Sequence, residues 1–167
     1  MAVNMKFKAI VPPKMNPDLY KLEMLKALDR EIQIDKRMLQ KTTTTWKSKP
    51  VFKTESKVTN KQAEARAWTE DDRWNWTDQG TKPHYIVARR AKYLTFATGG
   101  KPKTRVRTLG SGRGSRGKNW RRAKVVKHPG TEARLWSQEV VKRRRAYFLR
   151  DMGNANAKGA ARAQRGK

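Results

Sequence analysis

Residues 16–40 read NPDLYKLEMLKALDREIQIDKRMLQ and contain the strongest helical pattern in the chain. Asn16 is a favourable N-cap, and Pro17 suits the first helical position because its missing N–H is not needed there. Asp18 complements the positive end of a helix. An apolar stripe then repeats at helical spacing, made of Leu19, Leu22, Leu25, Leu28, Ile32 and Leu39. The pattern predicts a long helix to about residue 40 that covers the protein core.

Short strands are predicted on both sides of this helix. Residues 3–11 alternate apolar and polar side chains until Pro12-Pro13, which ends a strand. The β-branched run Thr42–Thr45 breaks the helix, and strand-like stretches follow at about 45–58 and 61–76.

The second half of the chain contains further predicted strands, followed by a helix. Residues 85–87, 93–96 and 125–126 have strand character. A second amphipathic helix is expected from an N-cap at Thr131 to just before Gly153. Its apolar face comprises Trp136, Val140, Val141, Tyr147, Phe148 and Met152. The sequence pattern therefore predicts two long helices and several short strands.

Three tryptophans, Trp68, Trp74 and Trp76, would share one face of a strand over 61–76. Core or subunit contact is the favoured interpretation and base stacking the alternative, because four carboxylates around them would repel phosphate. These are Glu70, Asp71, Asp72 and Asp78. Their spacing fits no known metal-binding loop, so no metal site or cofactor is expected.

Charge is the dominant property of the composition. The 167 residues include 41 Lys or Arg, 14 Asp or Glu and no Cys, which gives a net charge of +27. The lack of cysteine excludes disulfides, a thiol nucleophile and cysteine-based metal sites. No apolar run is long enough to span a bilayer, and no membrane partner is expected. Nucleic acid, acidic protein surface and anionic lipid are the classes of partner that such a charge attracts.

The charge lies mostly in the C-terminal part of the chain. Residues 1–98 carry 20 basic and 11 acidic residues, and residues 99–167 carry 21 and 3. Residues 97–124 are glycine-rich and acid-free, so a mobile or extended loop is expected there, projecting from a single domain over 1–152. Its ten cations are Lys101, Lys103, Arg105, Arg107, Arg113, Arg116, Lys118, Arg121, Arg122 and Lys124.

Two further basic segments follow the loop. The C-terminal part of the second helix carries Lys142, Arg143, Arg144 and Arg145, more cations than a helix dipole requires. Residues 153–167 contain no apolar side chain larger than alanine, and we expect a disordered basic tail. All of these cations are candidates for contact with DNA or a neighbouring subunit.

Patterns typical of enzymes are weak. Gly112 to Lys118 matches part of a phosphate-binding loop, but Asn119 stands where such a loop has Ser or Thr, and neither a buried strand nor an apolar helix flanks it. His84 and His128, the two histidines, each adjoin a turn, so a turn-stabilising role is favoured over general base catalysis. No catalytic residue is assigned, and the chain is not expected to be an enzyme.

Three ordered motifs resemble the phage tail-component family, which includes the neck and tail-completion proteins of long-tailed double-stranded DNA phages. They are DQGTKPHYI (78–86), AKYLTF (91–96) and VKHPGT (126–131). The family-motif turns fall on Gly80, Thr81, His84, His128, Pro129 and Gly130. The loop over 97–124 and the basic tail extend beyond the family's usual pattern, and Trp136 replaces its usual Phe.

The resemblance implies the α+β fold class, with the long N-terminal helix and the C-terminal helix packed on a small, mainly antiparallel sheet. It also implies a virion protein without enzymatic activity, made in the bacterial host cytoplasm. It implies a homo-oligomeric ring, a hexamer or dodecamer, that completes the tail and joins it to the head connector. Its neighbours would be connector or adaptor proteins and tail-terminator or tail-tube proteins. In such a ring the basic loop would face either double-stranded DNA in the lumen, without sequence specificity, or an acidic neighbour ring. The alternative is a ribosomal or other RNA-binding structural protein, for which size and charge would be equally natural.

Overall fold

The computed structural model of the chain describes residues 2–8, 16–59 and 62–165. The fold is α+β, as the sequence predicts. The predicted strand residues 9–11, the predicted end of that strand at Pro12-Pro13, and residues 166–167 of the predicted tail lie outside this part. The elements in chain order are β1 (Val3–Lys8), α1 (Pro17–Lys41), β2 (Phe52–Val58), β3 (Gln62–Thr69), α2 (Asp72–Gln79), β4 (His84–Val87), β5 (Leu94–Thr98), β6 (Asn119–Ala123), β7 (Val125–His128) and α3 (Trp136–Arg165).

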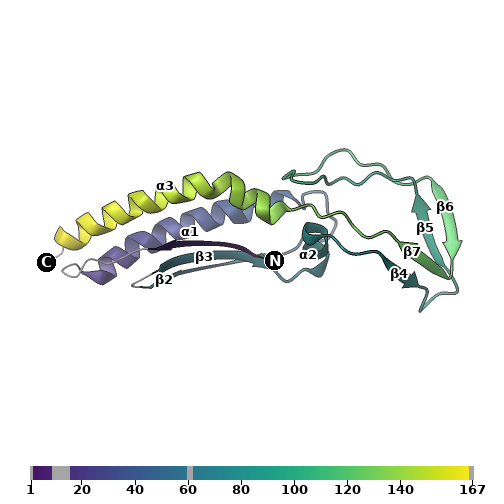
Figure 1. The fold of residues 1–167 in the computed structure, drawn as a ribbon, viewed down its shortest axis with the longest axis horizontal. Helices are drawn as coiled ribbons and strands as arrows, with labels where there is room; N and C mark the ends of the chain where they lie inside the picture. The colour runs from purple at the N-terminus through teal and green to yellow at the C-terminus, as the bar shows by residue number, and fades with distance from the viewer. Residues whose placement is uncertain (1, 9–15, 60–61, 166–167) are drawn as a thin grey trace.

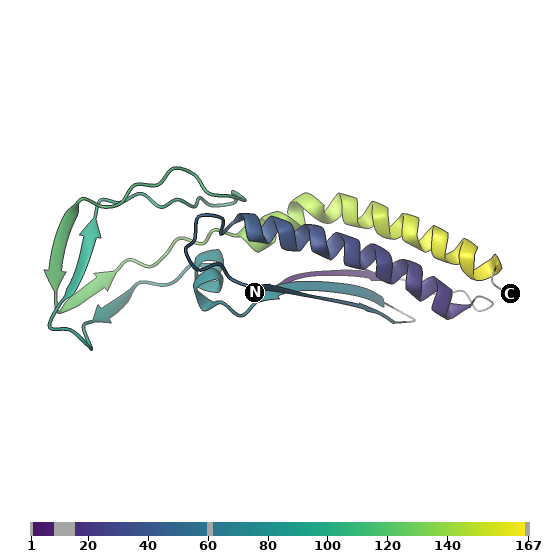
Figure 2. The same cartoon turned by 180° about the vertical axis from the view of Figure 1, so that it is seen from behind.

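Two long helices and a three-stranded antiparallel sheet form the body of the molecule. The sheet has the order β1-β3-β2, and α1 and α3 lie side by side over one of its faces (Figures 1 and 2). The central strand contributes Ala63, Ala65 and Ala67 to the core, each fully buried. Small side chains at these positions let the helices approach the sheet closely. The other face is polar and carries an ion pair between Lys6 and Glu64 at 3.7 Å.

Helix α1 begins and ends where the sequence predicts, but its buried face differs in part. The Asn16 side chain caps it by accepting hydrogen bonds from the backbone N–H groups of residues 18 and 19. Leu28, Ile32 and Leu39 are buried as expected, whereas Leu22 is 40% exposed. Each step of three residues falls about 60° short of a full helical turn, so the leucines spaced by three rotate away from the core. The remaining buried positions are Tyr20, Met24, Ala27, Glu31 and Asp35.

The three tryptophans do not share a strand face, because β3 ends at Thr69 and α2 follows. Trp74 is in the core, as the favoured interpretation has it, and its indole N–H donates to Thr42 Oγ1 at 3.0 Å. Its ring lies 6.0 Å from that of Trp136. Trp76 is 56% exposed, and Trp68 lies under the Arg66 guanidinium. The prediction failed because Asp71 caps a helix at this point, accepting from two backbone N–H groups.

Helix α3 begins four residues later than predicted. Thr131 is not its N-cap, because its backbone is paired with that of Thr81. The helix begins instead at Trp136, and the buried Asp78 carboxylate accepts from the Ser137 backbone N–H at 3.1 Å and from the Ser137 hydroxyl at 2.6 Å. A carboxylate at this end also suits the helix dipole. The short helix α2 thus fixes the start of α3.

The predicted disordered tail is wrong for residues 153–165, which continue α3. Ala155, Gly159 and Ala163 are buried, spaced by four residues along the side facing α1. An added Cβ at Gly159 would lie 3.0 Å from the Tyr20 ring, and the Tyr20 hydroxyl donates to Asn156 at 2.5 Å. The sequence contained the signal, because small residues at this spacing let two helices pack closely without large apolar side chains.

The two helices also share buried charges. Arg144 of α3 donates to Glu31 and lies 3.8 Å from Asp35 of α1. Glu31 and Asp35 are 1% and 0% exposed. Burial raises the pKa of Glu31, and it raises the pKa of Asp35 to about 7, because a desolvated carboxylate is disfavoured and Arg144 offsets only part of that cost. Neither Asp35 oxygen has a hydrogen-bond partner among the described residues.

Alanine substitution at two glycines of α3 tests whether this helix extends beyond Met152. Gly153 has nothing within 4 Å of an added Cβ. Gly153→Ala should therefore stabilise the protein by about 0.5–1 kcal/mol through helix propensity. Gly159→Ala should destabilise it by roughly 1–3 kcal/mol by overpacking against Tyr20. Urea unfolding measures both, and a disordered tail would make both substitutions neutral.

Asp35→Asn should remove part of the pH dependence of stability. The folded-state pKa of Asp35, about 7, lies above its unfolded value. Its contribution to the free energy of unfolding therefore falls as pH rises from about 4 to about 7 and is constant above that. The variant should match the wild type near pH 4 and exceed it by roughly 1–3 kcal/mol near pH 8. Urea unfolding at both pH values measures this, with exposed Asp29→Asn as control, and an unchanged pH profile would contradict it.

Candidate nucleic-acid interface

An arm formed by residues 81–131 projects from one end of the body (Figure 1). Its base is closed where Thr81 and Thr131 form an isolated antiparallel bridge, with backbone hydrogen bonds of 2.9 and 3.2 Å. Gly80 and Gly130 flank this bridge with φ of +75° and +91°. An added Cβ would lie 2.6 Å from the Thr131 carbonyl oxygen at Gly80, and 2.2 Å from that of Thr81 at Gly130. Both positions therefore require glycine.

The two histidines lie directly above this base. His84 and His128 pair across β4 and β7, and their rings stack with centroids 5.1 Å apart. His84 Nδ1 lies 2.9 Å from the Lys82 carbonyl oxygen, and His128 Nδ1 accepts from the Gly130 N–H at 3.1 Å. These local bonds agree with the predicted turn-stabilising role. All six family-motif residues therefore lie in one place, at the base of the arm.

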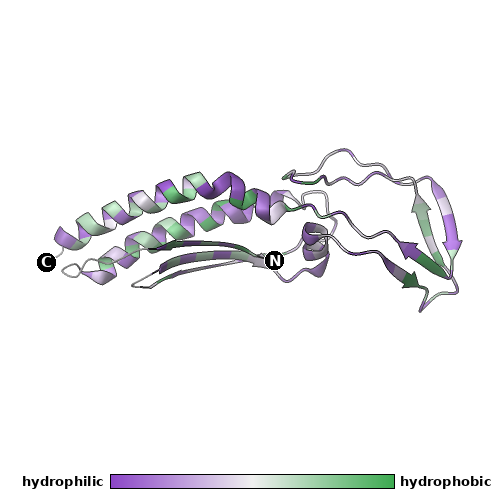
Figure 3. Ribbon diagram, viewed as in Figure 1, coloured by the Kyte–Doolittle hydropathy of each residue, from purple (hydrophilic) through white to green (hydrophobic). Residues whose placement is uncertain are grey.

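Beyond the base, the arm is two antiparallel ribbons, β4 with β7 and β5 with β6. The sequence did not predict β6. Several large apolar side chains on the ribbons are exposed, namely Tyr85, Ile86, Val87, Tyr93, Trp120 and Val125. Hydropathy differs between partners, since β5 is largely apolar and β6 largely hydrophilic (Figure 3). A two-stranded ribbon with this exposure has no core of its own.

The segment between β5 and β6, residues 99–118, runs back toward the body, and we name it the return loop (Figure 1). Its two limbs are joined by backbone hydrogen bonds between Lys101 and Ser115, at 2.9 and 3.0 Å. The Gly112 N–H also donates to the Lys103 carbonyl at 2.6 Å. The limbs approach closely because an added Cβ at Gly114 would lie 2.8 Å from the Lys101 carbonyl oxygen.

The tip of the return loop is bound to the body. The Arg107 N–H donates to the Arg134 carbonyl at 2.7 Å, and the Trp136 indole N–H donates to the Thr108 carbonyl at 3.0 Å. Leu109 packs against the core cluster. The loop is extended, and its tip is held against the body by these contacts. The sequence did not predict the backbone hydrogen bonds to the body.

The charged residues of the arm are all basic. Residues 81–131 contain 15 Lys or Arg and no Asp or Glu. All ten cations singled out over 97–124 are exposed. Among the described residues none of these ten forms an ion pair with a carboxylate, and Arg116 instead lies over the Trp120 ring at 5.5 Å. Such a surface attracts polyanions without neutralisation from its own chain.

The basic segment of α3 contributes less than the sequence suggested. Arg144 is committed to the buried pair with Glu31, and Arg143 pairs with Glu139 at 2.6 Å. Lys142 and Arg145 are exposed. The four cations therefore do not form one binding face. Sequence reasoning missed Arg134, which is 6% exposed and lies beside the return loop.

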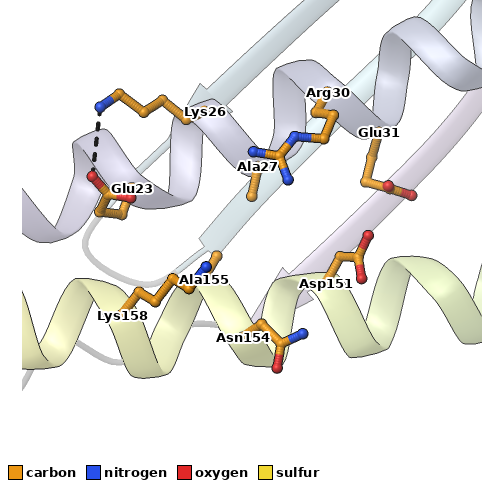
Figure 4. Close-up of a pocket in the computed structure, with 9 residues that line it drawn as sticks. All are labelled: Glu23, Lys26, Ala27, Arg30, Glu31, Asp151, Asn154, Ala155 and Lys158. Carbon is orange, nitrogen blue, oxygen red and sulfur yellow. Dashed lines mark ion pairs between the residues drawn. The ribbon is translucent and has the colours of Figure 1, made fainter.

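Other places offer weaker sites. A pocket of about 160 Å³ between α1 and α3 has a mixed lining of Glu23, Lys26, Arg30, Glu31, Asp151 and Lys158, together with Asn154 and two alanines (Figure 4). Opposite charges balance there, so neither an anion nor a cation is favoured. No group of three potential metal ligands occurs among the described residues. The segment resembling a phosphate-binding loop leads into β6 and not into a helix.

Comparison of the chain with protein-family models, with curated proteins and with solved structures found no match in any of the three. None of the described helices is long and apolar enough to cross a membrane.

Gly130→Ala should open the base of the arm. The new Cβ would collide with the Thr81 carbonyl oxygen and would sit on a residue with φ of +91°. We expect a loss of roughly 2 kcal/mol or more and faster hydrogen exchange at the Thr81 and Thr131 amides. Gly110→Ala is the control, because φ there is +125° but nothing lies within 4 Å. Equal effects of the two substitutions would show that strain alone matters and that the base is not closely packed.

Proposed function

We propose that this protein is a structural subunit of the neck of a long-tailed double-stranded DNA phage. In this proposal it forms a ring that completes the tail and joins it to the head connector. The proposal rests on the three sequence motifs and on the position of their turn residues at the base of the arm. Residues that define a family's pattern are expected to hold a shared structural feature, and here they join the arm to the body.

The arm supplies the proposed contact with DNA. Its 15 cations without a single carboxylate are the observation that carries this part of the proposal. Exposed Lys and Arg side chains on a narrow ribbon can neutralise backbone phosphates and release counterions, which gives affinity without sequence preference.

RNA binding is the second candidate, and exposed Trp120 beneath Arg116 favours it specifically. An aromatic ring next to cations is typical of surfaces that stack unpaired bases. Trp120→Ala separates the two functions. It should weaken binding to single-stranded RNA by a factor of ten or more if stacking dominates, and should change duplex DNA binding little if phosphates dominate.

Removing the cations of the return loop should weaken DNA binding. We expect substitution of Lys101, Lys103, Arg105, Arg107, Arg113 and Arg116 by Gln to lower affinity for random-sequence duplex DNA. The slope of log affinity against log salt should fall by about one for each phosphate contact removed. Fluorescence anisotropy at about 50 and about 200 mM NaCl measures both.

A matched control removes six exposed cations of the body, at Lys8, Lys41, Lys47, Lys49, Lys57 and Lys158. Both variants lose six positive charges. If the loop has a specific role, the loop variant should lose more DNA affinity than the control variant. Equal losses would indicate that total charge alone attracts DNA, which would contradict the arm as the contact surface.

Ring formation is the second test of the proposed function. The exposed apolar side chains of the arm should become buried between neighbouring subunits, because surfaces of this kind commonly mark contacts. Light scattering and electron microscopy of the purified protein, with and without DNA, should show a closed ring. A chain that stays monomeric at all concentrations would contradict this part of the proposal.

A further inference from the structure

A pocket of about 500 Å³ lies where the return loop meets the segment that leads into α3. The loop contributes Lys101, Arg105 and Arg113 to its lining, and the body contributes Arg134 and Glu132. Four cations thus surround one concave space with a single carboxylate. The three loop cations lie between 21 and 33 residues before Arg134 in the sequence, and the docked loop brings the four together.

Arg134 is the fixed member of this group. Its Nε donates to Thr104 Oγ1 at 3.2 Å, and its Nη1 donates to Glu132 Oε2 at 2.9 Å. These bonds occupy two of the five N–H donors of a guanidinium and hold its plane in one orientation. Among the described residues, these are the two hydrogen bonds that the Arg134 side chain forms, and its remaining N–H groups lie at the pocket that Arg134 lines. A buried guanidinium held this way can bind an oxyanion with two parallel hydrogen bonds.

We propose that this pocket binds one phosphate group. Arg134 provides the oriented donors, and the three loop cations supply mobile charges around the anion. This inference rests on the proposed function for the source of the phosphate, which in that setting is the DNA backbone. The same chemistry would bind free phosphate.

Glu132 sets the strength of the site. Its carboxylate is 73% exposed, so it orients Arg134 through one oxygen while water solvates the rest. It also reduces the net charge of the lining, which keeps the empty pocket from being strongly self-repulsive. Glu132→Gln should therefore strengthen anion binding several-fold at low salt while preserving a hydrogen bond to Arg134.

A second basic pocket serves as a comparison, because it lacks a buried cation like Arg134. That pocket, of about 460 Å³, is lined by Arg37, Lys41 and Lys49 and contains no carboxylate. It adjoins the C-terminal end of α1, where the helix dipole favours cations and disfavours a bound anion. None of its cations is buried. Lys49→Gln is therefore a matched control that removes a pocket cation without removing the proposed site.

The lining also implies that binding and docking of the return loop are coupled. The bound phosphate would contact cations of the loop and Arg134 of the body at once. A ligand that binds only the docked arrangement stabilises it by mass action. Bound phosphate should therefore slow hydrogen exchange at the Arg107 amide, which donates to the Arg134 carbonyl.

The experiment uses the full chain and two probes, inorganic phosphate and a random-sequence DNA duplex. Inorganic phosphate should raise the thermal unfolding midpoint above that in chloride of equal ionic strength. Lys101→Gln/Arg113→Gln alters only exposed side chains and should remove this shift. The same variant should weaken duplex binding about tenfold, against a few-fold for a control carrying Lys49→Gln and Lys47→Gln. Arg134→Gln should have the same effects as Lys101→Gln/Arg113→Gln, the pocket variant. If Arg134→Gln fails to fold, the pocket variant still tests the site, because it changes only exposed side chains.

The outcomes separate this inference from the proposed function. If the pocket variant behaves like the control with both probes, the phosphate site is overturned, whatever the six-cation loop variant does to DNA binding. If phosphate stabilises the wild type through Lys101 and Arg113 but the duplex does not bind, the site stands for free phosphate and the DNA role falls. If both probes depend on the pocket, the site is supported as a backbone phosphate site.

Discussion

The close backbone approach at the base of the arm is the constraint on which the rest of the structure depends. Thr81 and Thr131 pair there because Gly80 and Gly130 have no Cβ to separate the two backbones. Beyond this point the ribbons have no core and cannot fix their own position. The return loop provides a second attachment, and it reaches the same segment of the body, at residues 134–136. Two attachments to one short segment therefore define where all the arm's cations lie.

This arrangement works against the electrostatic repulsion within the arm. Two exposed cations about 4 Å apart repel by about 1 kcal/mol in water, and physiological salt reduces the effect of more distant pairs. One hydrogen bond contributes about 1 kcal/mol to stability, which is similar to the repulsion of one such pair of cations. The many backbone hydrogen bonds of the paired strands and of the docked loop therefore outweigh the repulsion in this fold. A bound polyanion would remove the repulsion as well. The charge distribution therefore couples the order of the arm to the presence of an anion, even before any particular contact is considered.

Local signals in the sequence predicted much of the body, because capping and periodicity act within a few residues. Asn16, Pro17 and the apolar repeat were sufficient for α1, and local strand character was sufficient for residues 85–87 of β4 but not for its pairing with β7. Features that depend on distant partners were not predictable in this way. Thr131 looks like an N-cap until its pairing with Thr81 is known. Trp74 and the small residues after Gly153 are likewise explained by Thr42 and Tyr20, which lie far away in sequence.

Two arginines near the start of α3 show why charge runs alone misplace a binding site. Arg144 belongs to a conspicuous basic run, yet it pairs with the buried carboxyl group of Glu31 and lies beside that of Asp35. Arg134 stands apart from any run, but it has one largely exposed carboxylate partner and three further cations beside it. A buried guanidinium costs free energy unless an anion accompanies it. That requirement is met inside the protein at Arg144 and only partly at Arg134, so the second site favours an anion from outside.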